Sequence, residues 1–97
     1  MVKAYVIINP ASRDFRCGKA WPGIKNRLIE RGFEIVEHMT ERIGHGAELA
    51  HQIRTEIEQS GEESPLVVAV GGDGIVHEVA SGLRGSSIPL GQIPFGS

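Results

Sequence analysis

Apolar and polar residues alternate in blocks along this chain, and the blocks predict strands that alternate with helices. Continuous apolar runs at Lys3 to Ile8 and Leu66 to Val70 are typical of strands that are buried on both faces. Phe33 to Glu37 alternates as a strand does, and Ile88 to Ile93 is expected to form a fourth strand. Helical spacing of apolar residues predicts helices in the intervening segments, over 17–31, over 44–59, and from the residues after Gly74 to about 83–85.

Each predicted helix carries an apolar face that should pack on the sheet. The expected inward residues are Ala20, Trp21, Ile24, Leu28 and Ile29 in the first helix, Ala47, Ala50, Ile53 and Ile57 in the second, and Val76, Val79, Ala80 and Leu83 in the third. Gly32 suits the end of the first helix. Regular alternation of strand and helix implies a three-layer α/β fold with a doubly wound parallel sheet. Ligands of such sheets bind outside the carboxyl ends of the strands, where the strand order reverses.

Composition narrows the functional classes. The 97 residues suit one domain of modest core, and the content of 40% hydrophobic and 23% charged residues is ordinary for a globular chain. The net charge of −2 offers no basic face, so we expect no nucleic-acid partner. Cys17 has no second cysteine to pair with, and the longest apolar runs are single strands. These features favour a cytoplasmic protein without a transmembrane segment and with at most peripheral membrane contact.

The most informative motif is Gly71 to Gly74, which follows the third predicted strand and precedes a helix. A strand, a tight glycine turn and a helix N-terminus direct backbone N–H groups at one place, and this arrangement suits phosphate. Asp73 lies inside the turn, and phosphates repel a carboxylate unless a divalent cation stands between them. We therefore predict a Mg²⁺–nucleotide site with Asp73 as the metal ligand. The alternative is that Asp73 only caps the following helix.

Three motifs follow strands in a recognisable order. They are Asn9-Pro10-Ala11-Ser12 after the first strand, Gly71-Gly72-Asp73-Gly74-Ile75-Val76-His77-Glu78 after the third, and Ile93-Pro94-Phe95-Gly96-Ser97 at the fourth. In these motifs the sequence resembles the catalytic domain of the diacylglycerol kinase and sphingosine kinase family of lipid kinases. The resemblance covers essentially the whole chain and only the N-terminal portion of the family.

The resemblance implies an ATP-dependent kinase that phosphorylates a lipid hydroxyl, such as that of diacylglycerol or a sphingoid base. It implies a Rossmann-like fold of the NAD kinase and phosphofructokinase type, in which residues 1–97 form the nucleotide-binding part and a C-terminal β-sandwich domain is absent. Asp73 would be catalytic through Mg²⁺. The implied nucleotide-binding residues are Asn9, Pro10, Ser12, Thr40, Gly71, Gly72, Asp73, Gly74, His77, Glu78 and Ser97. On this interpretation we expect a fragment that is inactive alone. Its open sheet edge and the face meant for the second domain would expose apolar surface, so we expect it either to form homo-oligomers or to be marginally stable.

Some positions depart from the family pattern. Ile75 and His77 stand where the family usually has Thr and Asn; Ile75 should pack against the sheet, whereas His77 can still donate a hydrogen bond. Arg13 replaces a glycine, and with Arg16 and Lys19 it either offsets nucleotide charge or belongs to a solvated loop. Purely structural alternatives stay open for the remaining residues: a plain turn at Asn9 and Pro10, a helix cap or strand-edge position at Thr40, and an exposed helix position at Glu78.

Other functional classes receive less support from the sequence. His38, His45 and His51 share no closely spaced helical face and have no cysteine partner, which argues against a zinc site. The glycine turn has Asp73 where a hydrolase would need a nucleophilic serine. NAD kinase and phosphofructokinase remain enzyme alternatives because they share Gly-Gly-Asp-Gly. A non-catalytic nucleotide-binding or regulatory module, or a natural single-domain remnant, also stays open.

Overall fold

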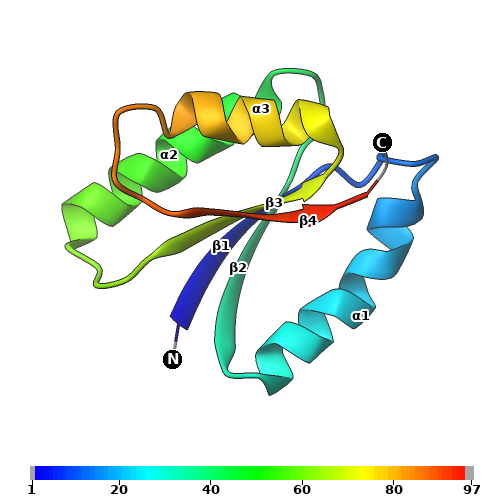
Figure 1. Ribbon diagram of the computed structural model, residues 1–97, viewed down its shortest axis with the longest axis horizontal. Helices are drawn as coiled ribbons and strands as arrows, with labels where there is room; N and C mark the ends of the chain where they lie inside the picture. Colours follow the sequence, from blue (N-terminus) through cyan, green and yellow to red (C-terminus); the bar gives the residue numbers. More distant parts are fainter. Residues whose placement is uncertain (1, 96–97) are drawn as a thin grey trace.

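A computed structural model describes residues 2–95 of the chain and shows strands and helices in strict alternation (Figure 1). The elements are β1 (Val2–Ile8), α1 (Arg16–Glu30), β2 (Phe33–Met39), α2 (His45–Ser60), β3 (Leu66–Gly71), α3 (Asp73–Gly82) and β4 (Leu90–Pro94). Between Val2 and Phe95, none of the helices has the length and apolar character needed to cross a membrane.

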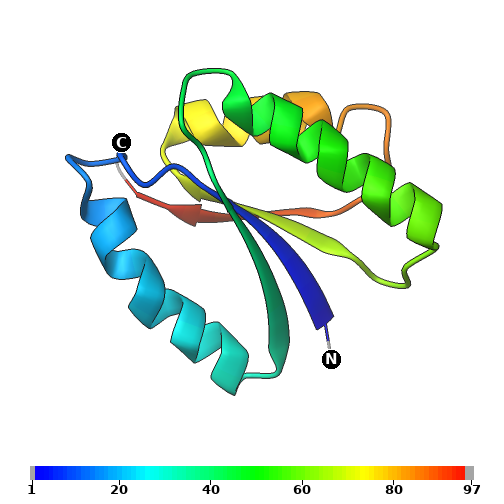
Figure 2. The same cartoon turned by 180° about the vertical axis from the view of Figure 1, so that it is seen from behind.

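The four strands form one parallel sheet in the order β2-β1-β3-β4. Helix α1 covers one face, and α2 and α3 lie together on the other, which gives the three layers expected from the sequence (Figures 1 and 2). The prediction of a doubly wound parallel sheet is therefore confirmed. The first and third strands are neighbours, because Ala4 to Ile8 pairs with Leu66 to Val70.

Side-chain alternation in β1 divides the core into two clusters. Tyr5 and Ile7 pack with α2 and α3, whereas Val6 and Ile8 pack with Cys17 and other residues of the α1 face. All these side chains are buried. Burying one large apolar side chain stabilises the folded state by about 1.5–3 kcal/mol. When a sheet is covered on both faces, the side chain at every position of its central strands is buried and can add to this stability. This explains why β1 and β3 are continuous apolar runs.

Most predicted helix faces are correct, and two positions are wrong. Ile29 is 48% exposed, and Ala80 is exposed although both were expected to point inward. Each lies one position beyond the stripe of its helix, where an extra apolar residue extends past the contact with the sheet. The fourth strand also begins at Leu90 rather than Ile88, since Pro89 has no N–H to donate to the ladder. Gly32, with a φ of 97°, ends the first helix as expected.

Candidate functional site

The strand order reverses between β1 and β3, and the loops that follow these strands lead to opposite faces of the sheet. Here the first and second motifs meet. The Asn9 N–H donates to the Val70 carbonyl at 2.9 Å, which places the start of the first motif beside the end of β3. The Thr40 N–H donates to the Ile8 carbonyl at 2.9 Å and brings the β2–α2 loop to the same end of the sheet. The architecture thus assembles residues from three separate loops.

Gly71 forms the turn that leaves β3, and only a glycine suits its surroundings. Its φ is 149°, a value that side-chain-bearing residues rarely adopt. A Cβ at this position would lie 2.7 Å from Ile75 Cγ2 and 2.9 Å from Ser12 Oγ. The side chains of Ser12 and Ile75 therefore pack against the main chain of Gly71 more closely than any side chain at residue 71 would allow.

Helix α3 begins directly after the glycine turn. Gly72 is its N-cap, Asp73 is its first residue, and the N-cap glycine has no side chain to form a cap hydrogen bond. The first N–H groups of a helix have no intrahelical acceptor, and an acid in the first turn is favoured by the helix dipole. Asp73 is exposed, and it forms no ion pair or side-chain hydrogen bond with another residue between Val2 and Phe95. Its carboxylate is thus accessible at a helix N-terminus.

A pocket of about 520 Å³ lies beside this turn at the carboxyl end of the sheet. It is lined by residues from the three loops and from α3: Asn9, Ala11, Thr40, Glu41, Arg42, Ile43, Gly74, Ile75 and Glu78. Four of the residues predicted to bind nucleotide, Asn9, Thr40, Gly74 and Glu78, line this pocket. The structure therefore brings together residues that are up to 69 positions apart in the sequence, counted from Asn9 to Glu78.

The other predicted residues lie next to the pocket or away from it. Gly71, Gly72 and Asp73 form the adjoining turn, and Ser12 contacts that turn from the first loop. Pro10 packs against Gly18, where a Cβ would lie 3.1 Å from Pro10 Cβ. His77 is exposed on α3 and does not line the pocket, so its role stays a prediction. Ser97 lies outside the described residues.

Ile75 is 4% exposed and belongs to the core cluster beneath α2 and α3, which confirms the prediction that it packs against the sheet. It also forms part of the pocket wall. The position that carries a hydroxyl in the resembling family is therefore apolar here, and it stabilises the floor of the pocket by packing. Nothing in its surroundings requires a hydrogen-bond donor.

Glu78 is not a free helix residue. Its Oε2 accepts a hydrogen bond from the Gly44 N–H at 3.1 Å, and its Oε1 accepts one from the Gly46 N–H at 2.9 Å. Gly44 is the N-cap of α2, so the carboxylate binds the first amides of that helix. A carboxylate is well suited to this position because the helix dipole is positive there. The alternative of an exposed, unengaged Glu78 is wrong.

Arg42 and Ile43 line the pocket, although the sequence reasoning did not select them. Ile43 is 96% exposed, and Arg42 Nη1 lies 2.5 Å from Oε2 of the exposed Glu48. This hydrogen bond raises the pKa of Arg42 and lowers the pKa of Glu48. Their sequence signal was available, because both residues follow Thr40 in a loop that leaves the carboxyl end of a strand.

The first loop carries unusual backbone conformations. Arg13, Asp14 and Phe15 all have positive φ values, of 56°, 54° and 69°. Three successive non-glycine residues in the left-handed region each cost of order 1 kcal/mol, and such conformations concentrate at functional loops. Arg13, Arg16 and Lys19 are exposed, which leaves both their contact with an anion and the solvated alternative open.

Comparison with known proteins shows the family of this chain. A family model described as the diacylglycerol kinase catalytic domain matches residues 3–97. A candidate lipid kinase of Bacillus subtilis, YtlR, is 35% identical over 94 residues, which cover 96% of this chain and 29% of that protein. Sphingoid long-chain bases kinase 1 of Arabidopsis thaliana is 33% identical over 103 residues, which cover 98% of this chain and 13% of that protein.

A solved structure supports the same fold. The crystal structure of a candidate diacylglycerol kinase from Bacillus anthracis superposes with a TM-score of 0.67 at 26% identity. The match covers 98% of this chain and 33% of that one. The chain therefore spans about a third or less of the length of these three similar proteins.

Proposed function

Because the chain belongs to the diacylglycerol kinase catalytic domain family, we propose that its pocket binds Mg²⁺–ATP for transfer of the γ-phosphoryl group to a lipid hydroxyl. The observation that carries this proposal is the meeting of the first motif with the glycine turn beside an open pocket. Asn9 and Gly74 lie in its wall, and the accessible Asp73 carboxylate is in the adjoining turn.

The phosphates would bind to backbone amides. The first turn of α3 presents N–H groups without intrahelical acceptors, and Gly74 has nothing within 4 Å of an added Cβ, so the main chain is open to an approaching anion. Side-chain donors of the first loop, such as the Ser12 hydroxyl close to Gly71, add to this environment. The nucleoside would occupy the pocket, whose size falls in the range usual for small-molecule sites.

The residues fit a magnesium ion that the substrate helps to hold. Between Val2 and Phe95 no group of three or more His, Cys, Asp or Glu residues is placed to hold a metal. Mg²⁺ is commonly bound by one or two carboxylates together with substrate phosphates, so one accessible carboxylate, Asp73, suffices. When bound, the ion would neutralise charge that develops on the transferred phosphoryl group. Asp73 would keep that ion beside the amides of α3.

We propose a chemical class for the molecule that accepts the phosphoryl group. One similar protein is named a sphingoid long-chain bases kinase, and the family model is named for diacylglycerol kinase. Both names refer to lipids that carry a primary or secondary hydroxyl group. We therefore propose a lipid alcohol as the acceptor, and parallel assays with diacylglycerol and a sphingoid base will distinguish the two.

Replacement of Asp73 tests this function. In the complete protein, Asp73→Ala should lower phosphoryl transfer at least about hundredfold, because removal of a group that stabilises transition-state charge typically has effects of that size. The thermal midpoint should change little, since Asp73 makes no cap hydrogen bond. Calorimetric titration with ATP should show Mg²⁺-dependent binding in the parent protein, and that dependence should weaken in the variant.

A matched control is Glu56→Ala, which removes an exposed carboxylate from α2 and should leave turnover unchanged. If Asp73→Ala instead retains near-normal turnover with a lowered thermal midpoint, Asp73 is only a structural residue of the helix N-terminus. Equal ATP affinity of the parent protein with and without Mg²⁺ would also contradict the assigned role.

A further inference from the structure

Helix α3 reaches across to the first turn of α2 with two side chains, Ile75 and Glu78. They are three positions apart and so lie on the same face of α3. We infer that Glu78 is a positioning residue that fixes the β2–α2 loop as one wall of the nucleotide pocket; this inference rests on the proposed function. Glu78 acts through the loop and not by contact with the reacting atoms.

Both carboxylate oxygens of Glu78 are engaged by backbone of the facing helix. Oε2 accepts from Gly44, the N-cap of α2, and Oε1 accepts from Gly46 in its first turn. Hydrogen bonds to an ionised acceptor are shorter and stronger than neutral ones. One residue of α3 thus binds the amide of the α2 N-cap and an amide of the first turn of α2, and the helix that begins at the glycine turn is coupled to the opposite wall of the pocket.

The close packing around Gly46 shows that this contact requires a glycine at position 46. A Cβ at residue 46 would lie 2.6 Å from Ile75 Cδ1, 2.8 Å from Glu78 Oε1 and 3.2 Å from Glu78 Cβ. Any side chain there would displace Ile75, Glu78 or the turn itself. A buried glycine, an apolar side chain and a carboxylate therefore form one interlocking contact.

The pocket wall that Glu78 positions is the segment from Thr40 to Gly44, which is attached at both of its ends. Its start is tied to β1 by the hydrogen bond from Thr40 to the Ile8 carbonyl, and its end is tied to α3 by Glu78. Arg42 and Ile43 line the pocket between the two anchors and are exposed. Among residues 2–95, the segment forms one ion pair, between Arg42 and Glu48 of α2, which is solvent-exposed and contributes little. The position of this wall thus depends on the anchors.

The contact between Glu78 and the start of α2 also determines where the nucleotide phosphates can bind. The amides at the start of α2 are occupied by a carboxylate, whose negative charge also repels a phosphate group. The first turn of α3, next to Gly71 to Gly74, has no such carboxylate acceptor in the described structure. Three helix N-termini lie at this end of the sheet. The first amides of α1 donate to carbonyl groups of the first loop and those of α2 to Glu78, so the N-terminus of α3 is the one left for the nucleotide phosphates. Glu78 therefore sets the direction in which the nucleotide lies.

Glu78→Gln in the complete protein tests the inference. A glutamine has one acceptor oxygen and a donating NH₂ group, so it can replace only one of the two hydrogen bonds. We expect the KM for ATP to rise about tenfold, as for the loss of one hydrogen bond to a charged group, while kcat changes less than about threefold. Hydrogen exchange at the amides of Gly44 and Gly46 should become faster.

Two further variants separate positioning from general stability. Glu58→Gln makes the same chemical change on α2 at an exposed carboxylate that accepts a hydrogen bond from Arg54, and it should leave KM unchanged. Gly46→Ala should raise the KM for ATP, and Ile75→Val should partly restore it, because valine lacks the Cδ1 atom that an added Cβ would meet.

The outcomes distinguish this inference from the proposed function. A parent enzyme that binds ATP, together with a Glu78→Gln variant of unchanged KM, would overturn the positioning role and leave the function intact. A parent protein that binds no ATP with Mg²⁺ would refute the function and the positioning role together, even if Gly44 and Gly46 stay protected from exchange. A parallel fall in thermal midpoint and kcat with unchanged KM would mean that Glu78 is only structural.

Discussion

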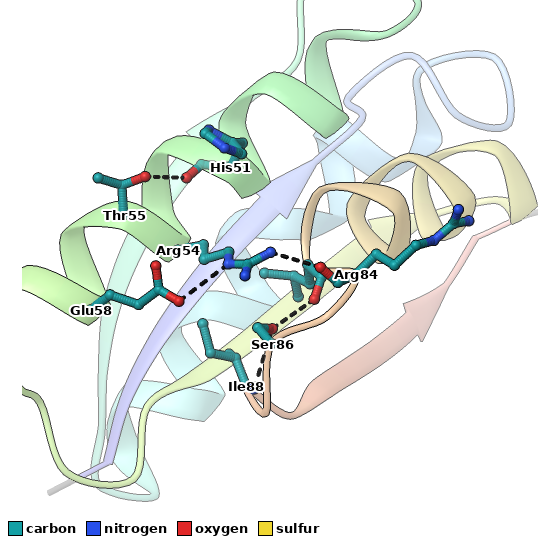
Figure 3. Close-up of polar contacts among 8 residues, drawn as sticks. His51, Arg54, Thr55, Glu58, Arg84, Ser86 and Ile88 are labelled. Carbon is teal, nitrogen blue, oxygen red and sulfur yellow. Dashed lines mark hydrogen bonds and ion pairs between the residues drawn. The ribbon is translucent and has the colours of Figure 1, made fainter.

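The two ends of the parallel sheet use similar polar residues in opposite ways. At the amino end, Glu62 accepts hydrogen bonds from the Tyr5 hydroxyl at 2.8 Å and from Lys3 Nζ at 2.9 Å. Figure 3 shows Arg54 of α2 donating to the Arg84 carbonyl, at 2.7 Å, in the loop that follows α3. In the same loop the Ser86 hydroxyl donates to the Leu83 carbonyl at 2.6 Å. Polar groups at this end satisfy one another.

The carboxyl end leaves polar groups open instead. Asp73 forms no ion pair with another residue of the described part of the chain, and Thr40 and Asn9 face a pocket. Of the four non-glycine residues with positive φ between Val2 and Phe95, three lie here, at Arg13 to Phe15, and one, Ser64, lies at the amino end. Unpaired donors and stored backbone strain reduce stability but leave groups available for a ligand. The amino end therefore stabilises the fold, and the carboxyl end carries the site.

The largest effect that separates the two ends is expected from Gly71→Ala. The added Cβ would lie 2.7 Å from Ile75 Cγ2 at a φ of 149°, so packing and backbone strain should together lower the free energy of unfolding by about 2–4 kcal/mol. ATP affinity should fall as well, because the turn itself is displaced. Urea denaturation and calorimetric titration with ATP measure the two quantities separately.

Gly23→Ala supplies the matched control. Gly23 lies inside α1, and an added Cβ would meet nothing within 4 Å. The same substitution there should raise the free energy of unfolding by about 0.5–1 kcal/mol through helix propensity and leave ATP binding unchanged. If the two glycine variants behave alike, the glycine turn has no special role.

A smaller effect on the free energy of unfolding is expected from Arg54→Ala, at the amino end of the sheet. The substitution removes the hydrogen bond to the Arg84 carbonyl and the ion pair with Glu58, and should lower the free energy of unfolding by about 1 kcal/mol. ATP affinity should not change. Glu58→Ala removes only the exposed ion pair and should cost less. A clear loss of ATP affinity in Arg54→Ala would break the division between the two ends.

The comparison also shows which features could be predicted from sequence. The strands and the doubly wound parallel sheet followed from apolar periodicity, and the position of a ligand site at the carboxyl ends of the strands followed from a general property of such sheets. These features depend on local patterns that repeat along the chain. The burial of Ile75 was also predicted, because an isoleucine beside a buried strand has no polar function to perform.

The features that could not be predicted from the sequence are contacts between residues that are far apart in the chain. Glu78 bonds to amides 34 and 32 positions earlier in the chain, and no local pattern states which helix N-terminus a carboxylate will reach. The pocket wall at Arg42 and Ile43 was missed because a short loop has no periodicity to interpret, and its one signal is its place after the carboxyl end of a strand. The outward positions of Ile29 and Ala80 depend on how far each helix is covered by the sheet. Sequence thus predicted which end of the sheet carries the site but not which side chains bind across its loops.

The smallest effect on the free energy of unfolding is expected from a decrease in pH, which should act through Glu62 at the amino end of the sheet. Hydrogen bonds from Lys3 and Tyr5 hold the pKa of the Glu62 carboxyl below its usual 4.5. A carboxyl whose pKa is lower in the folded state stabilises the fold above its unfolded pKa, and this contribution is lost as the pH falls through the folded pKa. Stability should therefore decline below about pH 4.5, and only slightly, because exposed ion pairs are worth little.

Glu62→Gln isolates this contribution, since glutamine accepts a hydrogen bond but does not titrate in this range. The difference in thermal midpoint between the parent protein and the variant should be largest near neutral pH and should shrink as the pH falls below 4.5. ATP affinity at neutral pH should be the same in both proteins, because Glu62 lies at the end of the sheet opposite the pocket. A constant difference across the pH range would show that the carboxylate charge contributes nothing to the fold.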